Sequence, residues 1–198
     1  MFNSCCQKFG YIFALTLISQ AIMMNFDMET PLVTMTNLKS EQLRAAMRTW
    51  SAGVTVATAT FEGSSHGMTV NSFTSISLDP AMITISLQTH TRTHELVQKS
   101  RAFGLTILSS EQTAISDLFA GRKPETQGRF ANIQTETLLT GSPFIVGGLA
   151  WLDCRVVQTF DAGMNTLFIA EVVAAREGMP GAPLLYHDRK YWSLSELK

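Results

Sequence analysis

The chain of 198 residues is long enough for one domain with a sizeable core, and its hydrophobic fraction of 45% argues against extensive disorder. Its 15 Lys and Arg nearly balance 16 Asp and Glu, so the sequence offers no basis for nucleic-acid binding. Cys5, Cys6 and Cys154 are too few and too unevenly spaced for a disulfide scaffold or a zinc site, which predicts a reducing, cytoplasmic compartment.

The N-terminal region differs in composition from the rest. Residues 9–24 are apolar and too short for a comfortable transmembrane helix, but they resemble the hydrophobic region of a signal peptide, with a cleavage triplet at 19–21. The single preceding cation, the two cysteines and the repeated methionines up to Met35 favour instead a non-native or misassigned start. We therefore expect an N-terminal extension over 1–35, a domain over 36–198 and no membrane association.

The remaining chain predicts one helix followed mainly by strands. Apolar residues at helical spacing behind Ser40 predict an amphipathic helix over 40–50, stopped by Gly53. Two further helices are predicted at 93–100 and 110–119, and 121–147 is predicted to be a long loop. Period-two or β-branched runs predict six strands, at 54–60, 67–76, 81–87, 103–108, 149–159 and 166–174. Close strands with inserted helices favour an antiparallel barrel over a doubly wound sheet.

The segment 66–80 is rich in Ser and Thr where a simple strand would be apolar. These hydroxyls alternate with Val70, Phe73 and Ile76, so one side can enter a sheet while the other offers short donors and acceptors to a flat polar ligand. A hydroxyl-rich edge hairpin fits the residues equally well.

A second polar segment, 87–94, leaves a strand and opens a helix at Thr93. Arg92 and the helix N-terminus would converge where an anion such as phosphate could bind. The alternative is that Thr93 only caps the helix and Arg92 is only a solvated surface residue.

Ordered blocks over about residues 40–194 resemble the flavin reductase family, including the reductase partners of two-component flavin monooxygenases such as styrene monooxygenase. The blocks are HGMTVNSFTSISLDP, AMITISL, FGLTIL, DLFAGRKPE, GRFANI, GLAWLDCRVVQ and TLFIAEV. The resemblance implies a mainly β fold, a six-stranded antiparallel Greek-key split β-barrel (the FMN-binding split barrel) with a few flanking helices. It also implies a homodimer with flavin at the subunit interface.

The resemblance also implies the cofactor-binding residues. It puts the isoalloxazine ring beside the 68–72 segment and the 86–88 strand, Thr74 near the ribityl chain, and the phosphate at 91–93. The complete set is Met68, Thr69, Val70, Asn71, Ser72, Thr74, Ser86, Leu87, Gln88, Thr91, Arg92 and Thr93.

The nicotinamide side is less clear because this chain departs from its relatives there. Relatives tend to carry a His before the strand that begins at Thr166, and this chain has Asn165, which can still donate a hydrogen bond. Relatives also close their substrate pocket with a C-terminal Tyr-His pair, here Tyr186-His187. Asn165 and His187 are therefore the candidates. Residues 117–122 are a candidate cover for the flavin, or simply a helix end stopped by Gly121.

No Rossmann, P-loop or nucleophile-elbow motif is present, and His66, His90, His94 and His187 lack metal-site spacing. We expect His66 and His90 at loops or strand ends, with a place in the lining of the site as the alternative. The predicted function is an NAD(P)H-dependent flavin reductase, moving hydride from NADH or NADPH to FMN or FAD, with no metal and with a flavin-dependent monooxygenase as partner.

Two alternatives remain open on the sequence. A non-enzymatic flavin-binding electron-transfer protein would need no nicotinamide pocket. A pyridoxine-phosphate type oxidase would need a second basic pocket, for which only Arg122, Lys123 and Arg129 are available.

Overall fold

The computed structural model describes residues 39–122, 128–194 and 196. The predicted extension over 1–35 lies outside these residues. The chain divides into a unit ending at Arg44 and a larger unit, residues 45–198, which contains the described strands. Within the described parts of the chain, no helix is both long enough and apolar enough to cross a membrane.

The first helix is shorter than predicted. Helix α2 spans Ser40–Met47 and starts as expected, but it ends six residues before Gly53, so the predicted stop at this glycine is wrong. Thr49 Oγ1 donates to Ala46 O at 2.8 Å, a local hydrogen bond of the kind that competes with continued helix. Gly53 lies in a two-residue strand, β1 (Ala52–Gly53).

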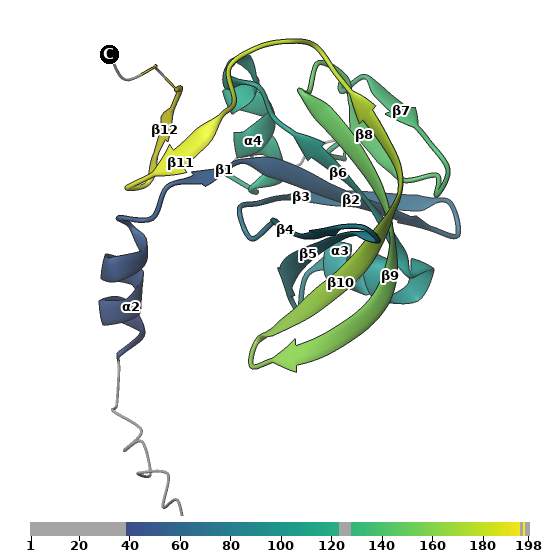
Figure 1. Cartoon of the computed structure of the whole chain (residues 1–198), viewed down its shortest axis with the longest axis horizontal. Coiled ribbons are helices and arrows are strands. Elements are labelled where there is room, and N and C mark those ends of the chain that lie inside the picture. The colour runs from purple at the N-terminus through teal and green to yellow at the C-terminus, as the bar shows by residue number, and fades with distance from the viewer. Residues whose placement is uncertain (1–38, 123–127, 195, 197–198) are drawn as a thin grey trace, which may run out of the picture. The chain divides into compact units, whose positions relative to one another are not determined.

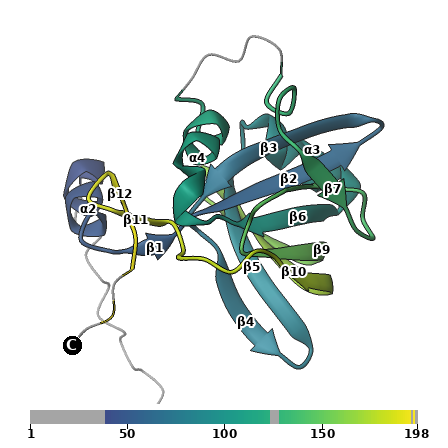
Figure 2. The same ribbon diagram turned by 90° about the horizontal axis from the view of Figure 1, so that it is seen from above.

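The larger unit is built on a seven-stranded antiparallel sheet in the order β3-β2-β6-β9-β10-β5-β4. The mainly β, antiparallel prediction is confirmed. The strands are β2 (Thr55–Phe61), β3 (Ser64–Val70), β4 (Thr74–Leu78), β5 (Ala81–Gln88), β6 (Ala102–Ile107), β9 (Ala150–Ala162) and β10 (Asn165–Glu177). Figure 1 shows the long β9–β10 hairpin crossing steeply over β2 and β3, and Figure 2 shows β4 and β5 projecting as a separate hairpin.

The single strand predicted at 67–76 is wrong, because the structure divides it into β3 and β4 at residues 71–73. At this corner Ser72 Oγ donates to Ser86 O at 2.9 Å and accepts from Ser86 N at 3.1 Å. Ser72 thus fixes the corner to β5 on the opposite side of the sheet order. The division explains why the sheet has seven strands where six were predicted.

Five short strands were not predicted. The predicted 121–147 loop contains β7 (Thr135–Thr137) and β8 (Pro143–Ile145), which pair with each other. The fully buried Asp153 accepts hydrogen bonds from the backbone N–H groups of Leu139 and Thr140. These bonds hold the turn between β7 and β8 in place. β1 pairs with β11 (Leu185–His187), and β11 pairs with β12 (Lys190–Trp192), forming a small second sheet.

Helices and core follow the sequence pattern. The two later predicted helices are confirmed as α3 (Arg92–Ser100) and as the 3-10 turn η1 (Ser110–Gln112) leading into α4 (Thr113–Phe119). Leu96 and Val97 of α3 pack into a core cluster with Phe103 and Phe168 from the sheet. Cys154 is fully buried in this cluster, and burial raises the pKa of its thiol, as expected for a structural cysteine.

Candidate functional site

Three hollows, each partly open to solvent, adjoin one another along the larger unit. The central hollow, of about 870 Å³, shares Thr69 and Ala120 with a second hollow of about 470 Å³, here called the tyrosine hollow. It shares Thr91 and Arg92 with a third, the histidine hollow, of about 1010 Å³. The three hollows therefore lie next to one another, with the central hollow in the middle, and this row of hollows is called the groove below.

The central hollow brings together residues that the sequence could only suggest as neighbours. β3 and β5 lie at nearly opposite ends of the sheet order, but the sheet curls, and the chain leaving β5 turns at once into α3 beside β3. Six of the twelve predicted cofactor-binding residues line this hollow: Met68, Thr69, Gln88, Thr91, Arg92 and Thr93.

The other six are distributed differently. Asn71 lines the tyrosine hollow, and Ser72 and Ser86 are bonded to each other at the β3–β4 corner. Thr74 lies exposed on β4. Val70 and Leu87 point into the core, so only their backbone groups are available to a ligand.

The predicted hydroxyl donors are largely engaged within the protein. Thr69 Oγ1 donates to Ser116 O at 2.7 Å, and Thr91 Oγ1 donates to Gln88 O at 2.8 Å. The fully buried Thr93 shares a 2.8 Å hydrogen bond with His66 Nδ1. These side chains shape the hollow, and the hydroxyl protons of Thr69 and Thr91 are already used, although their lone pairs can still accept.

Helix α3 begins one residue earlier than predicted, at Arg92, and its cap is Thr91, whose Oγ1 accepts from His94 N at 3.3 Å. The reading of Thr93 as the cap is therefore wrong. The backbone N–H groups of Arg92 and Thr93 are in the first turn, where a helix offers no internal acceptor. Together with the positive end of the helix dipole and the exposed Arg92 guanidinium, which donates to Ser64 Oγ at 2.8 Å, they could hold an anion.

Two further side chains line the central hollow: Arg129, which was not predicted as a flavin-binding residue, and His66, for which lining the site was the alternative expectation. Arg129 Nη1 donates to Gly67 O at 2.7 Å and Phe119 O at 2.9 Å, which ties β3 to the end of α4. His66, predicted at a loop or strand end, is buried within β3. The sequence signal for Arg129 was its place in the GRFANI block; His66 stood at the start of the hydroxyl-rich segment.

The tyrosine hollow is built around Arg122. Its guanidinium donates to Asp117 Oδ1 at 2.9 Å, Tyr186 Oη at 3.2 Å and Tyr191 Oη at 3.3 Å. It also lies 5.7 Å and 5.5 Å from the centroids of the two tyrosine rings, within cation–π range. The network joins the end of α4 to the β11–β12 hairpin.

Tyr191 completes this network. Its hydroxyl donates to Asp117 Oδ1 at 2.7 Å and lies 2.9 Å from Ser116 Oγ. Burial is the main reason that the pKa of Tyr191 is raised, so the phenol keeps its proton at neutral pH. Ser116 and Tyr191 were not predicted as site residues, and no local signal marks them. Gly121, at a φ of +70°, follows the end of α4, as expected for a helix end. Arg122 lines the tyrosine hollow, and a role of 117–122 in covering the flavin stays a prediction.

The two nicotinamide-side candidates are not brought together. Asn165 pairs with Gln88 across β10 and β5, beside the α3 end of the groove. His187 lies in the small sheet, where its Nδ1 is 2.9 Å from Ser51 Oγ, next to Tyr186 of the tyrosine hollow. Among the residues that the structure describes, no group of three or more His, Cys, Asp or Glu side chains is placed to hold a metal ion.

Comparisons with known proteins agree with this architecture. A family model described as "Flavin reductase like domain" matches residues 47–195. The chain is 38% identical over 160 residues to the NADH-dependent flavin reductase StyB of Pseudomonas fluorescens, covering 78% of this chain and 90% of that protein.

The chain also matches solved structures of flavin reductases. The styrene monooxygenase flavin reductase SMOB of Pseudomonas putida S12 matches with a TM-score of 0.70 and 35% identity, over 79% of this chain and 99% of that one. Streptomyces globisporus SgcE6, an NADH:FAD oxidoreductase in complex with NAD and FAD fragments, matches with a TM-score of 0.72 and 26% identity, over 78% and 92%. The split-barrel prediction is confirmed.

Proposed function

The chain belongs to the flavin reductase-like family, and from that premise we propose that it is an NAD(P)H-dependent flavin reductase supplying reduced FMN or FAD to a flavin-dependent monooxygenase. The observation that carries the proposal is the central hollow. It combines six of the predicted flavin-binding residues with an anion site at the start of α3.

The donor set of this hollow fits a flavin. The first-turn N–H groups of α3 and Arg92 suit a phosphate, while Gln88 and the backbone of the 68–72 segment suit the polar edge of a flat ring. Phe119 and Met68 add apolar surface against which such a ring can pack. We assign the phosphate to the α3 end and the ring to the β3 side.

We assign the nicotinamide to the tyrosine hollow, which adjoins the ring position through Thr69 and Ala120. Two tyrosine rings and Val54 give flat apolar walls, and Asn71 and Arg122 offer donors for a carboxamide oxygen. Of the two candidates, this assignment favours the His187 end over Asn165. His187 would act by holding Tyr186 through the small sheet, since its own ring contacts Ser51 and Trp192.

Hydride transfer from a nicotinamide to a flavin requires few reactive groups from the protein. A bound flavin accepts hydride from the nicotinamide C4 at its own N5 atom, so the chain has mainly to hold two rings in contact. The groove accordingly contains amides, hydroxyls and arginines. Among the described residues that line it, the one carboxylate is Glu95, which pairs with Lys99; Asp117, beside the tyrosine hollow, pairs with Arg122.

We further propose that the working form is a homodimer. Large apolar side chains left exposed on β4, β9 and the β9–β10 turn support this, because a subunit interface would bury them. They are Ile76, Leu78, Val157, Phe160 and Met164. Sedimentation at micromolar concentration tests the proposal, and a monomer would contradict it.

The test of function is nicotinamide oxidation by purified protein. NADH or NADPH should be consumed only when FMN, FAD or riboflavin is present, at a rate that follows flavin concentration. Nicotinamide consumption after exhaustive flavin removal would contradict the proposal. Flavin binding without nicotinamide oxidation would identify an electron carrier on the same fold, and reduction of the flavin by pyridoxine phosphate would identify an oxidase.

A further inference from the structure

The start of α3 is held by one face of β3. Residues two apart on a strand share a face, and three such residues of β3 contact three consecutive residues at the helix start. The pairs are Ser64 with Arg92, His66 with Thr93, and Met68 with Thr91. Of the three contacts, the one between His66 and Thr93 is buried. The position of the first turn of α3 therefore depends on β3.

The hydrogen bond between His66 and Thr93 is enclosed by the protein. His66 Nδ1 is 2.8 Å from Thr93 Oγ1, Thr93 is fully buried, and His66 is 9% exposed. A hydrogen bond in the low-dielectric interior is stronger than one in water, and a buried hydroxyl that loses its partner is costly. The bond therefore restricts both side chains to one arrangement.

Thr93 also belongs to the turn that offers donors to an anion. Because Thr91 is the cap, Arg92 and Thr93 are the first two residues of the helix, and their N–H groups have no acceptor within it. A shift of Thr93 relative to β3 would move both donors relative to a bound phosphate. Donors that are fixed before the ligand arrives bind it more tightly than donors that must be ordered on binding.

We propose that His66 is a positioning residue of the flavin site. Through its bond to Thr93 it fixes the first turn of α3 where the N–H groups of Arg92 and Thr93 bind a flavin phosphate. His66 therefore sets how strongly the protein prefers FMN, which has a phosphate, to riboflavin, which has none. The inference rests on the proposed flavin reductase function and names a residue that controls which flavins it uses.

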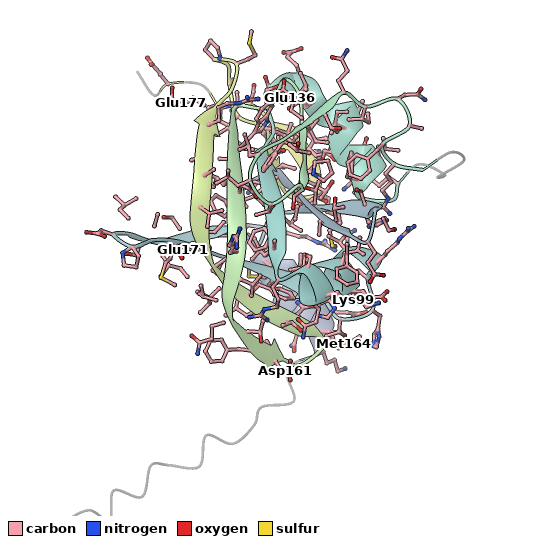
Figure 3. The ribbon with its side chains drawn as sticks, turned by 90° about the vertical axis from the view of Figure 1, so that its right-hand side faces the viewer. Lys99, Glu136, Asp161, Met164, Glu171 and Glu177 are labelled. Atoms are coloured by element: carbon pink, nitrogen blue, oxygen red, sulfur yellow. The ribbon has the colours of Figure 1, made fainter. Side chains whose placement is uncertain are left out.

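A second pair of histidine and threonine on the same helix provides a comparison. His94 Nε2 is 2.9 Å from Thr166 Oγ1, and Thr166 is buried near the start of β10. Figure 3 marks this region by Met164 at the tip of the β9–β10 hairpin, and Lys99 marks the last turn of α3.

This second pair ties α3 to β10 instead of β3. Neither His94 nor Thr166 lines the central hollow, and the N–H of His94 already donates to the Thr91 cap. The two pairs therefore use the same kind of bond on the same helix. Only the pair formed by His66 includes a residue whose N–H is available to a phosphate.

The test measures the dissociation constants of FMN and riboflavin by fluorescence titration of the full-length protein. In the unaltered protein FMN should bind at least about tenfold more tightly than riboflavin, because phosphate makes charge-assisted hydrogen bonds. His66→Leu fills a similar volume without a hydrogen-bonding atom, and Thr93→Val keeps the shape of Thr without its hydroxyl. Each should weaken FMN by about five- to tenfold and riboflavin by less than about twofold. The double variant should be within about twofold of either single variant, because both changes remove the same bond.

Two further variants separate positioning from general support of the fold. His66→Asn places an amide atom as many bonds from the backbone as Nδ1, so it should recover FMN affinity to within about twofold of the unaltered protein. Thr166→Val is the matched control, since it removes a buried hydroxyl bonded to the other histidine. It should lower the Tm but change the ratio of FMN to riboflavin affinity by less than about twofold. Thermal melting is measured for every variant.

Several outcomes would overturn the proposal. Equal losses of FMN and riboflavin in His66→Leu and Thr93→Val would do so, as would a lower Tm with an unchanged ratio of the two affinities. Losses that multiply in the double variant would show that the two residues act separately. If His66→Leu does not fold, Thr93→Val and its control Thr166→Val still decide the question. If the unaltered protein binds neither flavin, the reductase function itself fails, a result distinct from flavin binding that does not depend on His66.

Discussion

The two ends of the groove are built in different ways. At the α3 end, the chain from Gln88 to Gln98 supplies the loop, the cap, the anion site and most of the histidine hollow. At the other end, Arg122 and Ser116 meet tyrosines 64 to 75 positions away in the sequence. Within residues 39–122 and 128–194, Arg92 makes one side-chain hydrogen bond, to Ser64, whereas Arg122 makes three. The Arg92 side chain at the α3 end is therefore exposed to a charged ligand. The Arg122 side chain at the tyrosine end is held by hydrogen bonds to other parts of the protein.

This difference predicts that substitution of Arg92 at the α3 end changes mainly ligand affinity, while substitutions at the tyrosine end change affinity and stability together. Removing a group that contacts only ligand and solvent leaves the folded protein intact. Removing a member of a connected network leaves its partners unsatisfied as well. Five variants test this comparison.

The largest effect is expected from Arg92→Ala. Loss of a charge-assisted hydrogen bond to phosphate should weaken FMN and FAD by about 1.5–3 kcal/mol, or roughly 10- to 100-fold. Riboflavin, which has no phosphate, should change by less than about twofold. Flavin titration measures all three, and Arg155→Ala, an exposed arginine on β9, is the control. Equal losses for all three flavins would show that Arg92 acts on the fold or on another ligand.

A smaller, double effect is expected from Tyr191→Phe, which removes the hydroxyl bonded to Ser116 and Asp117. The free energy of unfolding should fall by about 1 kcal/mol, seen as a Tm lower by about 2–5 °C. Loss of the fixed hollow should also raise the apparent KM for NADH by about three- to tenfold.

The comparison variant at this end is Tyr186→Phe, which loses only the hydroxyl contact with Arg122. It should cost less stability than Tyr191→Phe. If Tyr191→Phe lowers flavin affinity and leaves the apparent KM for NADH unchanged, the positions assigned to the flavin ring and to the nicotinamide must be exchanged.

A pH-dependent effect is expected from His94, whose pKa is lowered in the folded protein by burial and by His90. The unfolded chain then binds more protons than the folded one below about pH 6.5, so stability falls as pH drops through this range. His94→Gln keeps a hydrogen-bonding group near Thr166 but cannot titrate. Thermal melts at pH 5 and pH 7.5 should show a smaller drop for the variant; an equal drop would mean that other groups control acid stability.

The smallest effect is expected from Asn165→Ala. Asn165 pairs with Gln88 at the α3 end, away from the hollow to which we assign the nicotinamide. The apparent KM for NADH should therefore change by less than about twofold. A larger increase, with flavin affinity intact, would show that the hydride donor reaches this end of the groove and that Asn165 acts where relatives carry a His.

The sequence by itself determined the elements whose signals are local. Period-two runs identified β2, β5 and β6 to within one or two residues, and helical spacing identified α3. Arg92 at a helix start was predicted because a β-strand, a turn and a helix follow one another within a short stretch. In such segments the backbone hydrogen bonds and the amphipathic face depend on neighbours in the chain.

The tertiary structure decided what depends on distant partners. β1, β11 and β12 have two or three residues each, too few for a periodic signal, and they exist because they pair with each other. Ser72 divides a continuous hydroxyl-rich run because Ser86 is opposite it, and Thr93 is buried because His66 is beside it. Tyr191 reaches Ser116 across 75 residues of sequence. Such contacts depend on how the sheet curls and where its ends meet, and no local pattern encodes either.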